Sequence, residues 1–79
     1  MKIVFVSMPK KAEQELNAIK DLITKFYDKV RFIESSNKVD FEALLTADMA
    51  FFAYDWQLSE RCILEHEICK RYGIEIIRD

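Results

Sequence analysis

The chain has 79 residues, of which 51% are hydrophobic and 33% charged, and it contains one glycine and one proline. That length predicts a single domain over residues 1–79, near the smallest size at which a hydrophobic core keeps a domain folded by itself. The net charge of −2 carries no basic excess, which argues against nucleic acid or an anionic membrane as a partner. A single glycine also excludes a Walker loop and a GxGxxG dinucleotide turn.

Two features indicate a cytoplasmic protein. The first apolar run, Ile3 to Val6, is far shorter than the core of a signal peptide or a membrane helix. The two cysteines, Cys62 and Cys69, would lie about 10 Å apart along a helix, too far for a disulfide within one chain. Reduced thiols are typical of the cytosol.

The first half of the chain alternates apolar strands with a helical segment. Lys2 to Ser7 is a continuous β-branched and aromatic run, which is typical of a strand buried on both faces. Ala12 to Tyr27 shows the period of an amphipathic helix, and Val30 to Glu34 reads as a short strand. The predicted apolar stripe of that helix consists of Leu16, Ile19, Ile23 and Phe26.

The second half repeats this alternation. Asp40 is a plausible N-cap of a short helix, and Gly73 is placed to end a long one. The predicted elements are a helix, a strand, a helix and a strand, over Asp40–Ala47, Met49–Tyr54, Leu58–Tyr72 and Ile74–Ile77.

Strands that alternate with helices predict right-handed crossovers and a parallel sheet. The two uniformly apolar strands, the first and third, belong in its centre. We therefore expect a three-layer α/β fold with four parallel strands in the order 2-1-3-4, a truncated flavodoxin-like or Rossmann-like sheet. Ligands of such sheets bind where the strand order reverses, which here is a crevice between Ser7–Lys11 and Tyr54–Ser59.

Glu65 interrupts an apolar helical face. On a helical wheel it falls near the middle of a face formed by Leu58, Cys62, Leu64, Ile68, Cys69 and Tyr72. A carboxylate there is costly unless it is paired, hydrogen-bonded or functional. Two interpretations stay open: an ion pair with Arg61 at the helix edge, or an acid or nucleophile that faces the crevice.

Other crevice residues also have two interpretations. Asp40 is explained by an N-cap worth about 1 kcal/mol, yet it lies on the same rim as the crevice. Trp56 and Tyr54 fit stacking on a base or sugar as well as a dimer contact. Lys10 and Lys11 fit a phosphate contact or solvated charge.

The spacing of Cys62, His66 and Cys69 superficially suggests a metal site. The two sulfurs lie about two helical turns apart, whereas zinc holds its ligands within one tetrahedron. We therefore expect no metal and no cofactor.

Taken together, these residues resemble the nucleoside 2-deoxyribosyltransferase-like superfamily, especially its small bacterial and phage members. The first block, FVSMPKK, is similar to a strand followed by a Ser-Gly-Pro-Met turn. The second, DFEALLTADMAFFAY, has Asp40 eight residues before Asp48. The third, DWQLSERCILEHEICKRYGIEII, matches in Trp56, Ser59, Cys62, Glu65 and His66.

The resemblance implies a nucleoside or nucleotide-like ligand and cleavage or transfer of its N-glycosidic bond. Glu65 would attack the anomeric carbon, and Asp40 would orient or protonate the substrate. Ser59 would hold a sugar hydroxyl or a phosphate oxygen. The remaining expected ligand contacts are Ser7, Met8, Pro9, Trp56 and Arg61.

The chain departs from the family at its turns. The usual Ser-Arg-Gly turn reads Ser59-Glu60-Arg61, so the glycine that lets a phosphate approach the backbone is missing. Met8 and Lys11 stand where glycines are common, and the link between the second strand and the short helix is shortened. These departures predict an altered or absent site for a 5′-phosphate.

The alternative function is a catalytically inactive module that senses or sequesters nucleotides, or inhibits another protein by contact. The exposed aromatics and the small core, together with the resemblance, favour a homodimer or a larger homo-oligomer.

Overall fold

The computed structural model describes residues 1–9, 13–34 and 38–78. Its sheet has four parallel strands in the order β2-β1-β3-β4. The strands are β1 (Lys2–Ser7), β2 (Val30–Glu34), β3 (Met49–Phe52) and β4 (Glu75–Arg78). The described helices are α1 (Glu13–Thr24), α2 (Phe41–Thr46) and α3 (Glu60–Tyr72), with a short 3₁₀ turn, η1 (Trp56–Leu58), before α3. The predicted α/β class, parallel sheet and strand order are confirmed.

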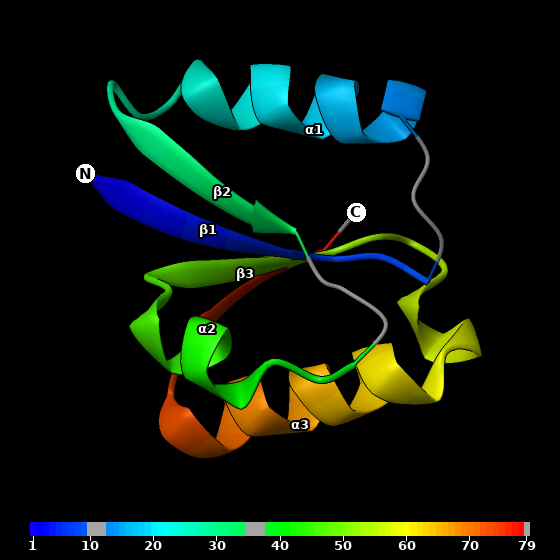
Figure 1. The fold of residues 1–79 in the computed structure, drawn as a ribbon. Helices are drawn as coiled ribbons and strands as arrows, with labels where there is room; N and C mark the ends of the chain where they lie inside the picture. Colours follow the sequence, from blue (N-terminus) through cyan, green and yellow to red (C-terminus); the bar gives the residue numbers. More distant parts are fainter. Residues whose placement is uncertain (10–12, 35–37, 79) are drawn as a thin grey trace.

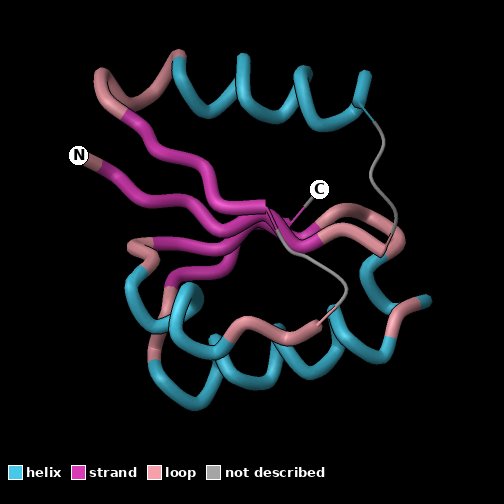
Figure 2. The backbone as a smooth tube through the Cα atoms, viewed as in Figure 1, coloured by secondary structure: helices cyan, strands magenta, loops and turns pink. Residues whose placement is uncertain are grey.

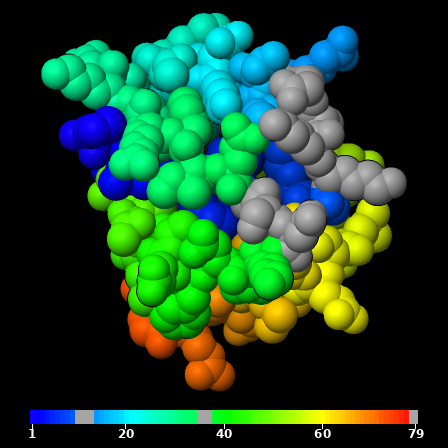
Figure 3. All heavy atoms as spheres, viewed as in Figure 1, coloured from blue at the N-terminus to red at the C-terminus, as the bar shows by residue number. Residues whose placement is uncertain are grey.

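The elements form three layers, with α1 on one face of the sheet and α2 and α3 on the other (Figures 1 and 2). In the space-filling view α1 and α3 lie at opposite ends of the molecule, and α2 is at the surface between the sheet and α3 (Figure 3). Within the described ranges, none of the helices is long and apolar enough to cross a membrane.

Both faces of the central strands are apolar because both are covered. Alternate residues of a strand point to opposite faces, so a doubly covered strand needs a continuous apolar run. The face beneath α1 holds Val4, Val6, Met8, Met49, Phe51 and Ala53, packed against Leu16, Ile19 and Ile23. The opposite face holds Phe5, Ala50 and Phe52, packed against Leu44 of α2 and Cys69 of α3.

The register of β1 and β3 places a polar residue at the carboxyl edge of the sheet. Ser7, the last residue of β1, lies opposite Phe52, the last residue of β3. The Ala53 N–H donates to the Ser7 carbonyl over 3.1 Å, which keeps the two chain ends together as they leave the sheet. α3 begins close to this edge (yellow in Figure 1), so its first turns face the ends of β1 and β3.

The predicted end of the first helix was wrong. α1 ends at Thr24, and Phe26 is 76% exposed instead of extending the apolar stripe. The Thr24 hydroxyl donates to the carbonyls of Lys20 and Asp21, and the Phe26 N–H donates to Ile23, three residues back. This tighter turn ends the helix and rotates Phe26 out of the stripe. The expected start, Ala12, lies outside the described residues.

The boundaries around α3 also differ from expectation. β3 ends at Phe52, two residues before the predicted Tyr54, and α3 starts at Glu60 because η1 comes first. Leu58 therefore lies outside the helix to which the wheel applied, and it is 84% exposed. Leu64 is 55% exposed and lies on the flank of α3 instead of its buried face.

The helix ends follow the predicted capping chemistry. The Asp40 side chain accepts a hydrogen bond from the Ala43 N–H over 3.0 Å, so its N-cap interpretation is confirmed. Gly73 ends α3 in the left-handed conformation with φ of 69°. A residue with a Cβ is disfavoured there, which is why the chain uses its one glycine at this position.

Two adjacent leucines of α2 test the assignment of the core. Leu44 is fully buried, whereas Leu45 is 45% exposed. We expect Leu44→Ala to lower the free energy of unfolding by about 2–5 kcal/mol, because it leaves a cavity between α2 and the sheet. The matched variant Leu45→Ala should cost about 1 kcal/mol or less. Urea unfolding measures both, and equal losses would contradict the assigned face of α2.

Candidate functional site

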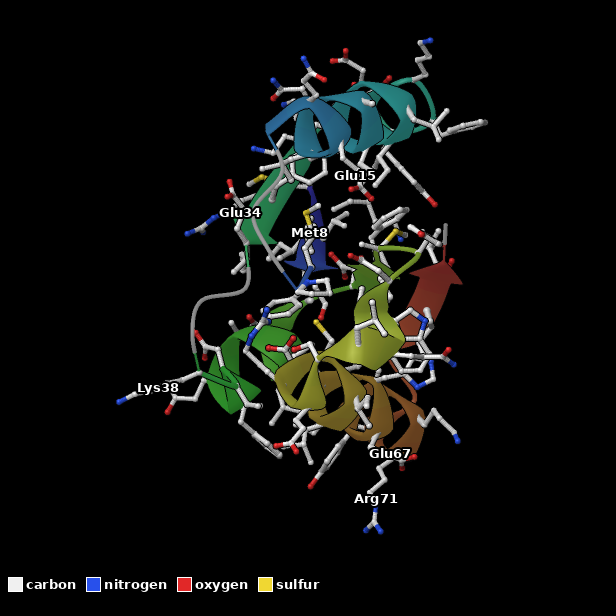
Figure 4. All side chains as sticks on the ribbon, turned by 90° about the vertical axis from the view of Figure 1, so that its right-hand side faces the viewer. Met8, Glu15, Glu34, Lys38, Glu67 and Arg71 are labelled. Atoms are coloured by element: carbon white, nitrogen blue, oxygen red, sulfur yellow. The ribbon has the colours of Figure 1, made fainter. Side chains whose placement is uncertain are left out.

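The candidate site lies at the carboxyl ends of the strands, where the order of the sheet reverses between β1 and β3. Figure 4 looks onto this side of the molecule and shows Met8 between α1 and the first turns of α3. The chemistry of the site centres on Glu65, which projects from α3 toward the end of β1. Its side chain is fully buried.

Ser7 provides the first partner of this carboxyl group. The Ser7 hydroxyl donates to Glu65 Oε1 over 2.7 Å, and both side chains are buried. Serine is unusual in an apolar central strand, and here the hydroxyl supplies the hydrogen bond that a buried carboxylate requires. The contact joins the end of β1 to the second turn of α3.

Arg61 provides the second partner. Its Nη1 donates to Glu65 Oε1 over 3.0 Å, and Nη2 donates to the carbonyl oxygen of Met8. The expected Arg61–Glu65 ion pair is therefore confirmed, but it lies inside the protein, with the side chains 14% and 0% exposed. The pair is compatible with the second interpretation, because Glu65 also contacts Ser7, at the end of β1 where the crevice is predicted.

The two oxygens of Glu65 differ. Oε1 accepts from both Ser7 and Arg61, whereas Oε2 is buried and accepts no hydrogen bond from any described residue. Burial raises the pKa of the carboxyl above its usual value, against the opposing effects of Ser7, Arg61 and the backbone N–H of Asp40.

Cys69, one turn further along α3, shares this apolar surrounding. Burial, together with the negative charge of Glu65, raises the pKa of the Cys69 thiol to about 11. The thiol therefore stays protonated at neutral pH and acts as a core side chain instead of a nucleophile.

The side chains of Asp40 and Ser59 serve as helix caps. The Asp40 carboxylate is exposed and holds the Ala43 N–H. The Ser59 hydroxyl accepts from the Cys62 N–H over 3.4 Å at the start of α3. A ligand that binds either side chain has to share it with the backbone N–H group that it already caps. The ligand contacts expected of Asp40 and Ser59 therefore stay predictions.

The aromatic residues after β3 differ in exposure. Tyr54 is 78% exposed and is available at the surface. Trp56 stacks on His66, with ring centroids 4.1 Å apart and planes at 12°, and it meets Phe52 edge to face at 5.7 Å. One face of the indole is thus already covered by α3, so stacking of a base on Trp56 needs its other face.

The structure describes some of the remaining residues predicted to contact a ligand, and others lie outside the described ranges. Met8 is buried and its backbone carbonyl accepts from Arg61, and Pro9 beside it is partly buried. Lys10 and Lys11 lie outside the described residues, as does most of the shortened link after β2. Among the described residues, no group of three or more His, Cys, Asp or Glu side chains is arranged to hold a metal ion.

Sequence reasoning missed two contacts of the site. The stacking of Trp56 on His66 joins residues ten positions apart through the η1 turn, and helical periodicity gives no signal for it. The Met8 carbonyl is held by Arg61 across 53 positions, and no side-chain pattern could indicate a backbone acceptor. Only the polar Ser7 at the end of an apolar strand gave a hint.

Comparison of the chain with protein-family models, curated proteins and solved structures finds no match.

The buried carboxyl makes stability depend on pH in a specific direction. Because the pKa of Glu65 is raised in the folded state, the folded protein binds more protons than the unfolded chain above pH 4.5. The free energy of unfolding therefore falls as the pH rises from 4.5 through the raised pKa, by at most about 1.4 kcal/mol per pH unit.

Glu65→Gln should remove this dependence. Relative to the wild type, we expect the variant to gain stability steadily as the pH increases above 4.5, as measured by urea unfolding across pH 4.5–8. Glu67→Gln, which changes an exposed carboxylate on the same helix, is the matched control. If the two variants show the same dependence on pH, the perturbed group is not Glu65.

Proposed function

We propose that the protein binds a nucleoside or nucleotide at the carboxyl ends of β1 and β3 and cleaves or transfers its N-glycosidic bond through Glu65. The observation that carries this proposal is a buried carboxyl group at the strand-order reversal, with one oxygen held by Ser7 and Arg61 and the other unpartnered among the described residues. The resemblance of the sequence blocks to nucleoside 2-deoxyribosyltransferase-like proteins agrees with this placement.

A carboxylate nucleophile has to be ionised and has to present an oxygen with a free lone pair, and the two oxygens of Glu65 suit these two requirements. Ser7 and Arg61 favour the ionised form at Oε1, which a buried carboxyl group needs in order to react. Oε2 keeps its lone pairs, and desolvation makes a negative charge on it more reactive toward a cationic centre. A carboxylate in this state stabilises the positive charge that develops at the anomeric carbon more strongly than it binds the neutral substrate.

The proposed reaction has two displacements. In the first, Oε2 forms a bond to the anomeric carbon while the C–N bond breaks, and the base leaves with the electron pair and takes up a proton from Asp40 or from solvent. In the second, water or another base attacks the same carbon and gives up its proton to Asp40 or to solvent, and the glycosyl ester bond breaks to return the carboxylate. The configuration of the sugar is retained, as expected for two inversions.

The runner-up function is a module that binds nucleotides without catalysis. One observation favours it specifically: Glu65 is fully buried and its Oε1 is already engaged by an internal cation. Buried ion pairs of this kind also serve to position elements without any chemistry. Such a module would bind the same ligands and leave them intact.

A panel assay separates the two functions. We expect the protein to release free base from at least one member of a panel of ribo- and 2′-deoxyribonucleosides and their 5′-monophosphates, detected by chromatography. Glu65→Gln should abolish the release, because the amide cannot form the glycosyl ester. Glu67→Gln, on the exposed side of α3, should release base at the wild-type rate.

Each other result has a defined meaning. Calorimetric binding without release of base supports the non-catalytic module. If the protein neither binds nor cleaves any member of the panel, both functions are excluded.

A further inference from the structure

A hollow lies at the amino ends of the strands, on the edge of the sheet opposite Ser7 and Glu65. In Figure 1 this edge is on the left, where the N-terminus, the turn between α1 and β2 and the start of β3 come together. The hollow measures about 460 Å³, which is within the usual range of small-molecule sites. Its lining comes from three separate segments of the chain: Met1, Lys2, Tyr27, Asp28, Lys29 and Asp48.

Backbone contacts hold these three segments together. The Lys2 N–H donates to the Lys29 carbonyl over 2.9 Å. The Asp48 N–H donates to the Ile3 carbonyl over 2.8 Å, and the Ile3 N–H donates to Asp48 Oδ2 over 2.7 Å. The walls of the hollow are therefore fixed by the sheet itself instead of by side-chain packing alone.

The charges around the hollow are balanced but do not pair with one another. Two lysines, Lys2 and Lys29, and two aspartates, Asp28 and Asp48, line it. Within the described part of the chain, no ion pair joins either lysine to either aspartate. Lys2 instead places its Nζ over the ring of Tyr27, 5.5 Å from the centroid. Both signs of charge are thus available around one hollow, beside an aromatic ring.

We propose that this hollow binds a free α-amino acid with an apolar or aromatic side chain. The lining carries no net charge, so the lysines repel a simple cation and the aspartates repel a simple anion. A zwitterion satisfies both sets, because its carboxylate contacts an ammonium group while its own ammonium group contacts a carboxylate. Because Glu65 lies at the other edge of the sheet, the inference is independent of the proposed function.

The lining residues divide the contacts of such a ligand. Lys29 is exposed and makes no ion pair within the described ranges, so it suits the ligand's carboxylate. Asp48 uses Oδ2 to hold the start of β1, so its Oδ1 suits the ligand's ammonium group, together with Asp28. Tyr27 and Met1, the two less polar members of the lining, supply surface for the ligand's side chain.

Titration of the full chain with L-phenylalanine, followed by amide NMR signals, tests both the ligand and its place. We expect the signals of Lys2, Lys29 and Asp48 to shift, and those of Ser7 and Glu65 to stay unchanged. Two analogues each lack one charge: phenylalaninamide has no carboxylate, and N-acetylphenylalanine has no ammonium group. Each should bind at least about tenfold more weakly, because it loses a hydrogen bond between charged groups. Glycine, which keeps both charges without a side chain, should also bind more weakly.

Variants of the lining test the same contacts from the side of the protein. Lys29→Gln should weaken the binding of L-phenylalanine by about fivefold or more. Asp48→Asn keeps an oxygen for the Ile3 N–H but loses the charge, and it should weaken binding by a similar factor. Lys29 is exposed, so its variant carries the test if Asp48→Asn fails to fold. The matched controls Lys25→Gln and Asp21→Asn remove exposed charges outside the lining and should bind as the wild type does.

Three results would overturn the inference. If L-phenylalanine binds no more tightly than either analogue, the hollow does not recognise a zwitterion. If the two lining variants bind as the wild type does, or if the controls weaken binding as much as they do, the charges of the lining do not hold the ligand. If neither amino acid binds to the wild type, the inference fails, whereas the proposed function at Glu65 is decided separately by the release of base.

Discussion

The fold and the site both depend on one buried group, the carboxyl of Glu65, and on the two donors that hold it. Ser7 donates to it from the end of β1, and Arg61 donates to it from the first turn of α3. The Ser7 contact fixes α3 against the centre of the sheet. A carboxylate taken out of water without such partners would cost several kcal/mol. The position of α3 is therefore tied to a polar contact in an otherwise apolar interface.

This arrangement makes the structural and chemical interpretations of Glu65 compatible. The same hydrogen bonds that justify its burial hold one oxygen in place and leave the other without a partner among the described residues. Apolar surroundings that include Cys69 keep the pKa of the carboxyl raised and keep the thiol protonated. A perturbed acid at the reversal of strand order is a candidate for a functional group, and a buried ion pair that only positions α3 would have the same contacts.

Local patterns in the sequence predicted the order of elements, the parallel sheet, the capping by Asp40 and the end of α3 at Gly73. They failed where a short-range turn overrides periodicity: Phe26 leaves the stripe of α1, and Leu58 belongs to η1 instead of the helix. Periodicity also singled out Glu65, because a charge inside an apolar face violates a local rule. Its partners were harder to predict, since Ser7 lies 58 positions away and the Met8 acceptor is a backbone carbonyl.

The central place of β1 in the sheet has a consequence for how the chain folds. β1 is made well before its neighbour β3, and the Ile3–Asp48 contact spans 45 positions. β1, α1 and β2 form one continuous unit, and that unit leaves the second face of β1 uncovered until α2 and α3 arrive. Closing such long loops costs entropy before any contact compensates it, and it slows folding relative to a helical bundle of this size. A growing chain therefore exposes the apolar edge of β1 during synthesis, when the chain is most open to aggregation or to binding by chaperones.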